Sequence, residues 1–515
     1  MSVNEQAAPA PLGSDEATLH QLGYAQELRR RMSGFSNFAV SFTIISILSG
    51  CLTLYGFGMN TGGPAVIVWG WPFIGIMTLF VGLSMAEVCS SFPTAGGLYY
   101  WSAKLARKNG GAWSWFTGWF NFLGQVAVTA GIDFGAAFFL TAFLNLQWGY
   151  PATPGYTILI YGLILLLHGV LNQFGVRLVA ILNDISVWWH ITGVLIIVGA
   201  LIFGLKAGAH HASAGFVFSH LENLSGFHIG WWYILPVGLL MAQYTFTGYD
   251  ASAHMTEETH DAARSGPRGI VMSILISLIA GWVLLIGVTF AIQKGNYVNE
   301  ALAGTAAPGQ IFIDSIGRTG AELLLLVVIG AQLFCGMSSV TANSRMIYAF
   351  SRDGALPGSA FWHKVNKRTR TPTNAIWLAA GGALILGLPY LWNTAAYGAV
   401  TSIAVIGLYI AYVTPTYLRL RRGDSFKRGP WHLGRWSYVI GWTAVTWVVI
   451  IVLLFMLPQF GPIGWATFNY ACIAVAVVIG YAGISWLVSA KNWFKGPKVQ
   501  GSSEELAAIE RELSA

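Results

Sequence analysis

The chain has 515 residues, of which 55% are hydrophobic and only 10% are charged. Soluble domains carry roughly 25% charged residues, so this composition excludes an ordinary soluble domain and indicates a polytopic membrane protein. The net charge of +7 does not indicate a nucleic-acid partner, because the basic residues follow the distribution of a membrane protein. The four cysteines lie far apart in apolar runs without metal-ligand spacing, so we expect no metal site and no cofactor.

Twelve segments are apolar over the roughly 20 residues that a membrane span requires. These predicted spans are 37–60, 65–92, 113–143, 155–172, 180–204, 231–254, 269–292, 321–350, 374–392, 396–418, 437–457 and 466–489. The first 30 residues are mostly polar and lack the apolar core of a signal peptide, so we expect the first span to direct insertion.

The basic residues predict the orientation of the chain. Of the 28 Lys and Arg residues, 24 lie in the tails and loops on the side of the two termini, and Arg345 lies inside a span. The other side carries only Lys206, Lys294 and Arg318. By the positive-inside rule, both termini are predicted to be cytoplasmic in a multi-pass protein of the cell (inner) membrane.

Two spans carry small or polar residues near their middle, at Ser46–Cys51 in span 1 and at Tyr244–Asp250 in span 6. They lie five helices apart, as expected for two five-helix halves of inverted topology, in which paired helix breaks form the substrate site. A break exposes N–H groups at one half-helix start and carbonyl groups at the other half-helix end, which suit a carboxylate and an ammonium. Alternatively, Gly50 and Gly248 only permit close helix packing.

Three stretches together resemble a known family: Ala86–Trp101 at the end of span 2, Thr245–Thr259 in span 6 and Ala342–Pro357 at the end of span 8. From about residue 34 to residue 490, the chain resembles the amino acid–polyamine–organocation superfamily and, within it, the amino acid–choline transporter family. The resemblance implies secondary transport of amino acids, 4-aminobutyrate, choline or other amines, without fixing which.

The resemblance also implies an all-α fold with a leucine-transporter-like 5+5 inverted repeat and two peripheral helices. The first repeat then occupies 37–204, the second 231–420 and the peripheral helices 437–489. A cytoplasmic N-terminal tail (1–36), an extracytoplasmic loop (205–230) and a cytoplasmic C-terminal tail (490–515) complete the predicted organisation. Residues 503–513 are expected to form a short surface helix.

Site residues follow from the resemblance, residue by residue. The unwound part of helix 1, which holds the substrate carboxylate in related permeases, matches Ser49, Gly50 and Cys51, although many relatives have Gly-Ser-Gly or Gly-Ala-Gly there. The unwound part of helix 6 matches Phe246, Thr247 and Gly248, and candidate aromatic gates over the amine are Tyr244 and Phe246. Further candidates for the substrate site are Gln125 in span 3 and Thr401 and Ser402 in span 10.

Ionisable residues inside spans are functional candidates, because their insertion costs about 2.5–3.5 kcal/mol each. His190 in span 5 lies near the place where a lysine replaces sodium in some proton-coupled relatives, so the resemblance implies a proton as the coupling ion. Histidine titrates near physiological pH and can exchange that proton. Two alternatives remain: a neutral His190 hydrogen-bonded between helices, or sodium held by helix 1 carbonyls and the hydroxyls of Ser338 and Ser339.

Other charged residues are candidates for coupling or gating. Asp133 in span 3 is placed to attract a cationic amine or, alternatively, to partner a polar group on a neighbouring helix. Asp184 is expected to anchor or gate the cytoplasmic end of span 5, and Asp250 to tie the second half of helix 6. The gate candidates are Glu87, Asp184, Asp250, Glu257 and Arg345, although solvated helix ends and topology signals explain such charges almost as well.

The chain has no Gly-x-x-x-x-Gly-Lys-Ser/Thr, His-Glu-x-x-His or Gly-x-Ser-x-Gly motif, so neither an enzyme nor a nucleotide-driven pump is predicted. The sequence predicts a secondary active transporter in the lipid bilayer that moves amino acids or small amines by alternating access, with H⁺ coupling. The alternatives are a sodium-coupled carrier, an exchanger of choline- or polyamine-type cations, and a membrane sensor built on a transporter fold.

Overall fold

The computed structural model describes residues 15–174 and 176–514. In this part of the chain, eleven helical segments are long and apolar enough to cross a membrane. They are the pair α2 (Gly34–Ile45) and α3 (Ile47–Thr53), then α5 (Gly63–Ser91), α7 (Gly110–Trp148), α8 (Pro154–Gln173), α9 (Val176–Phe203), α14 (Ala262–Ala291), α16 (Ala307–Arg352), α18 (Thr373–Gly387), α19 (Ala396–Arg422), α20 (Ser437–Met456) and α21 (Ala471–Ser485).

The remaining predicted span, 231–254, is not one helix. It is divided into α11 (Trp231–Gly238), α12 (Leu240–Thr245) and α13 (Ala251–His254), each too short to cross a membrane alone. With this broken segment the bundle contains the twelve predicted spans, and the all-α, multi-pass membrane fold is confirmed.

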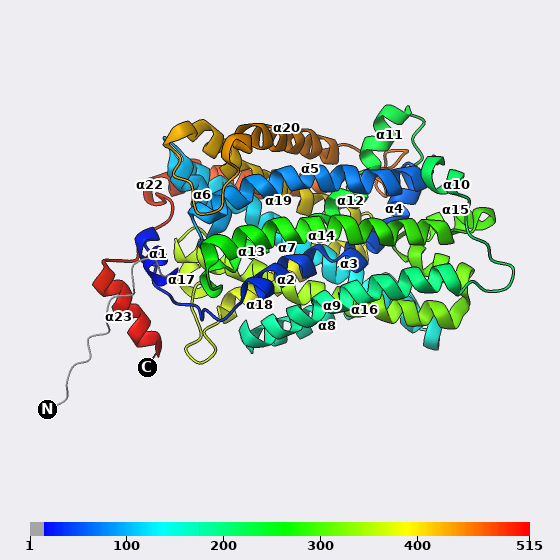
Figure 1. Ribbon diagram of the computed structural model, residues 1–515, viewed down its shortest axis with the longest axis horizontal. Coiled ribbons are helices and arrows are strands. Elements are labelled where there is room, and N and C mark those ends of the chain that lie inside the picture. Colours follow the sequence, from blue (N-terminus) through cyan, green and yellow to red (C-terminus); the bar gives the residue numbers. More distant parts are fainter. Residues whose placement is uncertain (1–14, 175, 515) are drawn as a thin grey trace.

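Both described chain ends lie at one end of the bundle, together with α1 (Asp15–Leu22), α6 (Gly97–Leu105), α17 (Ser359–Trp362), α22 (Lys491–Trp493) and α23 (Ser503–Ser514) (Figure 1). We call this end the terminal face. The opposite face carries α4 (Tyr55–Asn60), α10 (Ala214–Ser219) and α15 (Tyr297–Leu302). An even number of crossings returns the chain to the side on which it began, as observed.

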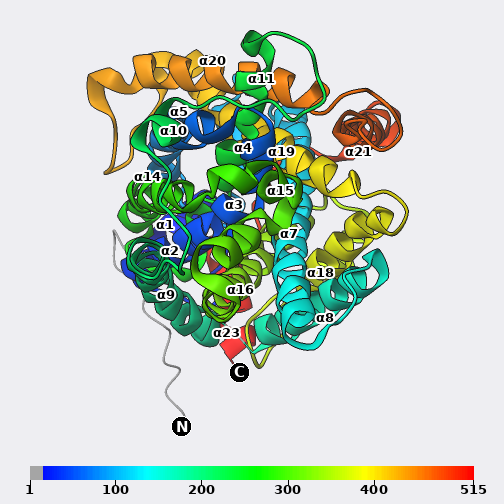
Figure 2. The same ribbon diagram turned by 90° about the vertical axis from the view of Figure 1, so that its right-hand side faces the viewer.

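The helix contacts have the symmetry of an inverted repeat. The second, third and fourth helices of one half contact their counterparts in the other half, since α5 packs on α14, α7 on α16 and α8 on α18. The contact of α9 with α16 is matched by that of α19 with α7, as required if the fifth and tenth helices are equivalent. In Figure 2, α3 lies near the centre of the bundle, whereas α20 and α21 lie at its rim.

The rim helices present aliphatic side chains outward. Leu163 of α8, Leu195 of α9 and Val477 of α21 are each more than half exposed. Large apolar surfaces of this kind are stable against lipid tails rather than water. The central helices are instead enclosed by protein. Irregular backbone at membrane depth is tolerated where protein buries it, as it does here.

One long helix contains a second irregularity. At Gly317 in α16 the backbone is non-helical (φ 83°, ψ 173°), a left-handed conformation that glycine adopts without a steric penalty. The apolar part of α16 therefore begins after this bend, in agreement with the predicted span 321–350.

At the opposite face, Glu300 of α15 is buried. Burial raises the pKa of its carboxyl group from 4.5 to about 8, and nearby Asp314 adds to the rise, whereas a hydrogen bond from the Gln293 N–H partly opposes it. The folded protein therefore holds a proton on Glu300 between about pH 4.5 and pH 8 that the unfolded chain has released.

Linkage then predicts that this residue lowers stability as pH rises through that window, because the native state binds more protons than the unfolded state. We expect Glu300→Gln to reduce the fall in melting temperature between about pH 5 and pH 8. Thermal unfolding of the detergent-purified protein across this range measures the slope. Exposed Glu504→Gln is the control, and equal slopes in wild type and E300Q would contradict the prediction.

Candidate functional site

The first span is interrupted at Ser46. This residue adopts a left-handed conformation (φ 42°, ψ 80°), so α2 ends at Ile45 and α3 begins at Ile47. The Ser46 carbonyl accepts hydrogen bonds from the N–H groups of Ser49 and Gly50, both at 2.8 Å. Among the described residues, no acceptor contacts the N–H groups of Ile47 and Leu48. A buried half-helix thus starts with two unpaired donors.

The predicted unwinding at Ser49, Gly50 and Cys51 is therefore wrong in its position. These three residues form the first turns of α3, because that helix closes directly onto Ser46. All three remain buried next to the break. The break itself lies at the start of the predicted Ser46–Cys51 segment, at a serine rather than at a glycine.

The sixth span is interrupted between Thr245, the last residue of α12, and Ala251, the first residue of α13. Here the prediction is confirmed, because Phe246, Thr247 and Gly248 lie outside both helices, and Gly248 has a φ of 87°. The freed backbone groups are partly satisfied by α19: the Gly248 N–H donates to the Tyr412 hydroxyl (3.2 Å), and the Phe246 carbonyl accepts from the Tyr409 hydroxyl (2.6 Å).

The two breaks contact each other. A Cβ atom on Gly50 would lie 2.5 Å from Cγ2 of Thr245, and one on Gly248 would lie 2.1 Å from Cγ2 of Ile44. Both distances are shorter than real carbon contacts, so the approach requires glycine at each position. Close packing and irregular backbone therefore occur together here, although the sequence left them as alternatives.

Aromatic residues surround this junction. The ring of Phe246 packs on that of Trp71 with centroids 4.4 Å apart. The hydroxyl groups of Tyr244 and Tyr397 are buried without a hydrogen-bond partner among the described residues. Buried hydroxyl groups are usually satisfied, so these two retain hydrogen-bonding capacity that a small polar ligand can use.

A cavity of about 390 Å³ lies at the opposite face. Its wall includes Thr53 at the end of α3, Tyr397 of α19 and Gln459 in the segment after α20. Ser402 is connected to it, because its hydroxyl accepts a hydrogen bond from the Gln459 amide (2.7 Å), whereas Thr401 donates to the Gly398 carbonyl within α19. Neither Ser402 nor Thr401 forms a described hydrogen bond with the backbone of either helix break.

The terminal face is closed by two buried ion pairs. Arg345 of α16 contacts Glu258 at 2.8 Å, and Arg352 contacts Glu257 at 3.2 Å. These four side chains are at most 4% exposed. The predicted gate candidates Arg345 and Glu257 thus take part in neighbouring pairs, one with each of two successive glutamates.

Residues 24–33, which we call the N-terminal strap, lie across these pairs. The N–H groups of Arg31 and Met32 both donate to the Glu258 carbonyl at 2.9 Å, and Arg30 donates to the Thr256 carbonyl at 2.9 Å. The Arg352 guanidinium stacks 3.8 Å above the Tyr24 ring. Backbone bonds and a cation–π contact therefore add to the closure made by the ion pairs.

His190 of α9 contacts the break in the first span. Its Nε2 lies 2.7 Å from the Ser46 hydroxyl, and its Nδ1 lies 2.8 Å from the Ser186 carbonyl. Because a carbonyl can only accept, Nδ1 carries a hydrogen, and Nε2 faces a hydroxyl that can either donate or accept. These two hydrogen bonds are therefore compatible with a neutral or a protonated imidazole.

Asp250, the last residue of the sixth-span break, is at the centre of a buried network. Its carboxylate accepts from the Gln125 amide (2.7 Å) and the Tyr412 hydroxyl (2.6 Å), and it lies 3.2 Å from Nε2 of His254. Nδ1 of His254 contacts the Ala95 carbonyl at 2.9 Å. Gln125 and Asp250 thus belong to one cluster, which ties α13 to α7 and α19. His254 was missed in the sequence, although its four-residue spacing from Asp250 is the helical contact distance.

The other ionisable candidates have partners away from the break. Asp133 of α7 pairs with His168 of α8 at 3.1 Å, and Asp184 of α9 accepts from the Ser36 hydroxyl at 3.1 Å. Glu87 pairs with Arg419 at 3.0 Å, in a cluster separate from the Arg345 and Arg352 pairs. His168 was also missed, although a histidine inside an apolar span is itself a signal.

The two serines considered for sodium are engaged with neighbouring helices. Ser338 donates to the Asn183 side chain, and the Ser339 hydroxyl lies 2.8 Å from that of Thr129. Their hydroxyl oxygens therefore already take part in helix–helix hydrogen bonds. A hydroxyl group that donates its hydrogen keeps oxygen lone pairs, so these bonds leave sodium coordination by the two serines open.

Comparison with known proteins adds the family context. The sequence model of a family described as amino acid permease matches residues 32–479. Similar proteins include the amino-acid permease BAT1 homolog of Oryza sativa subsp. japonica, 46% identical over 93% of this chain and 95% of that protein. The amino-acid permease BAT1 of Arabidopsis thaliana is 44% identical (96% and 98%), and the GABA-specific permease of Saccharomyces cerevisiae is 34% identical (96% and 87%).

The buried Arg345–Glu258 pair yields a stability prediction. Arg345→Gln leaves the Glu258 carboxylate buried without its cation, so we expect a loss of about 3–5 kcal/mol. Arg318→Gln makes the same chemical change in the Arg318–Glu322 pair, whose arginine is 61% exposed, and about 0–1 kcal/mol is expected there. Unfolding of both variants in detergent measures the difference. Equal melting temperatures for R345Q and R318Q would refute it.

Proposed function

This chain belongs to the amino acid permease family and is an amino acid transporter, and we propose that it is a secondary active carrier of amino acids and related small amines that works by alternating access. The observation that carries the proposal is the pair of unpaired N–H groups at Ile47 and Leu48, buried beside a second broken helix. Such donors at the start of a half-helix attract a carboxylate, and inside a membrane protein they are not satisfied by water.

The substrate is proposed to lie between the two breaks. Its carboxylate contacts the start of α3, including the backbone of Ser49, Gly50 and Cys51 and the N–H groups just before them. Its ammonium lies toward the carbonyl end of α12 and the rings of Tyr244 and Phe246, which offer cation–π faces. Thr247 and Gly248 complete the wall of the proposed substrate site. Gln125 acts indirectly, through its hydrogen bond to Asp250. Thr401 and Ser402 lie on the side of the site nearer the cavity.

The two faces are proposed to have different roles in the cycle. The terminal face is the cytoplasmic one, since 24 of the 28 Lys and Arg residues fall on its side. The closed ion pairs there and the cavity at the opposite face correspond to a carrier that is closed to the cytoplasm. Inward opening then requires the Arg345–Glu258 and Arg352–Glu257 pairs and the strap contacts to separate.

We propose a proton as the coupling ion and His190 as its carrier. The imidazole contacts Ser46, the residue directly before the two free N–H groups. A carboxylate bound at those donors would stabilise the protonated imidazole electrostatically, and its departure would favour proton release. Substrate and proton binding are thereby linked through one residue of the break.

The first test is transport by the purified protein in liposomes. We expect saturable uptake of one or more members of a panel of α-amino acids, 4-aminobutyrate, choline and polyamines, driven by an inward proton gradient and independent of sodium. The γ-amino acid belongs in the panel because a relative is named for it. Non-saturating conductance, or uptake of none of these solutes, would reject the carrier proposal.

The coupling proposal is tested with His190→Gln, which preserves hydrogen bonding but cannot carry the proton. We expect uptake driven by a pH gradient to fall to the level without a gradient, while substrate exchange persists. His228→Gln, in an exposed loop of the opposite face, is the control. Unchanged pH-driven uptake in H190Q would exclude His190 as the coupling residue.

The glycine junction is tested with Gly248→Ala. The added methyl group meets Ile44 in a left-handed backbone conformation, at a strain of about 1–3 kcal/mol, so we expect uptake to fall about tenfold or more. The control is Gly199→Ala in α9, where a Cβ meets no atom within 4 Å. Initial uptake rates, normalised to the amount of folded protein, measure the effect. Equal rates in the two variants would show that the junction does not need its close contact.

A further inference from the structure

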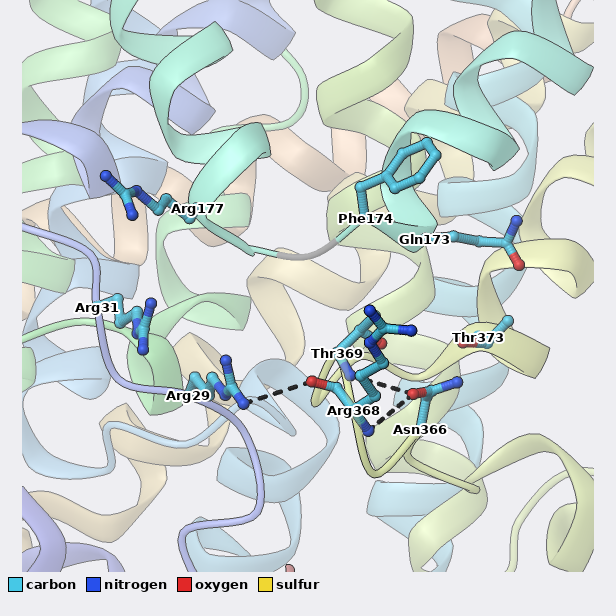
Figure 3. A pocket seen from close by; sticks show the side chains of 9 residues that line it. All are labelled: Arg29, Arg31, Gln173, Phe174, Arg177, Asn366, Arg368, Thr369 and Thr373. Carbon is cyan, nitrogen blue, oxygen red and sulfur yellow. Dashed lines mark hydrogen bonds between the residues drawn. The ribbon is translucent and has the colours of Figure 1, made fainter. Parts of the chain in front are cut away.

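The terminal face carries a basic pocket that the transport proposal does not use. It has a volume of about 590 Å³, and Figure 3 shows Arg29, Arg31, Arg177 and Arg368 arranged around it. These arginines come from three separate parts of the chain: the N-terminal strap, the start of α9, and the loop before α18. We propose that this pocket binds the phosphate headgroup of an anionic phospholipid.

Among the described residues that line the pocket, none is acidic. None of the four arginines forms an ion pair with a described acidic residue, in contrast to Arg345, Arg352 and Arg419. All four are exposed, and the one hydrogen bond of the Arg29 side chain among the described residues is to the Arg368 carbonyl, at 3.4 Å. Guanidinium groups are suited to phosphate because their planar donors can bind two oxygens at once.

The other wall of the pocket supplies neutral polar groups. Gln173 at the end of α8 and Thr373 at the start of α18 line it, and Asn366 and Thr369 belong to the loop before α18 (Figure 3). This loop has a fixed shape, because the Asn366 side chain accepts from the N–H groups of Arg368 and Thr369 at 3.0 and 3.1 Å. The backbone that carries Arg368 and Thr369 is therefore held in one turn by Asn366.

A lipid fits better than a soluble anion because the pocket continues into apolar surface. Phe174, on its rim, is 67% exposed, and Trp377 of α18 donates to the Gln173 side chain at 3.3 Å. One helical turn beyond Arg177, Ile181 is also exposed, as is Leu167 two turns before Phe174. A headgroup among the arginines would thus place its acyl chains along the outward surface of α8 and α9.

Bound lipid would connect elements that hold the terminal face closed. Arg29 and Arg31 belong to the strap, whose backbone donates to the Glu258 carbonyl. Arg370, in the same loop as Arg368, donates to the Glu27 carbonyl at 2.7 Å. A phosphate that bridges strap and loop therefore reinforces existing contacts, so binding should raise thermal stability.

The test compares lipids and matched variants. Protein purified in a neutral detergent is titrated with phosphatidylglycerol or with phosphatidylcholine, and thermal unfolding is recorded. We expect phosphatidylglycerol, but not phosphatidylcholine, to raise the wild-type midpoint by about 3–5 °C at saturation. In Arg177→Gln/Arg368→Gln most of this rise should be lost. Arg421→Gln/Arg428→Gln removes the same charge from exposed positions outside the pocket and should keep it.

Other outcomes would overturn the proposal. If inorganic phosphate alone reproduces the whole rise, the ligand is a soluble anion rather than a lipid. If R421Q/R428Q loses the rise as fully as R177Q/R368Q, the effect is general electrostatic attraction. Native mass spectrometry of single R177Q and R421Q variants provides a second readout that needs only small amounts of folded protein. Equal retention of phosphatidylglycerol by both would also refute the pocket.

Discussion

The architecture depends on two neighbouring helix breaks, at which the helical main-chain hydrogen bonds are interrupted. A membrane protein satisfies its peptide groups inside each helix because the lipid offers no partner. Here two helices are interrupted side by side, at Ser46 and at Phe246–Asp250. The interruption is possible because the surrounding helices shield the freed peptide groups from lipid. Hydroxyl groups of Tyr409 and Tyr412 partly replace the missing helical bonds in the second break.

The two sides of the breaks are held by different interactions. Toward the terminal face, charged side chains are buried in pairs, and backbone bonds of the strap cover them. Toward the opposite face a cavity remains, lined by apolar side chains such as Phe57 and Phe460 and by uncharged polar ones such as Asn60 and Gln459. Buried ion pairs are strongly orientation-dependent, whereas apolar contacts tolerate sliding. The terminal face is therefore held together by directional interactions, which depend on exact geometry.

The sequence predicted the spans well, because a run of about 20 apolar residues has few alternatives to crossing the membrane. It also predicted the break in the sixth span, where Gly248 occupies a left-handed conformation. It misplaced the first break, because the left-handed residue there is a serine whose hydroxyl contacts His190, a contact between distant spans that local pattern does not report. Partners such as Arg419 for Glu87 and His168 for Asp133 likewise depend on how helices pack against one another.

The connection between α2 and α3 consists of a single residue, and its neighbours on both sides are fully helical. Rigid rods joined at one point can change their mutual angle through two torsions, without stretching or unwinding either rod. The two torsions of Ser46 would therefore be the centre of any change in the angle between α2 and α3. If α2 tilted about Ser46, the start of α3 would stay in place. A ligand bound at the start of α3 would then not need to move with α2.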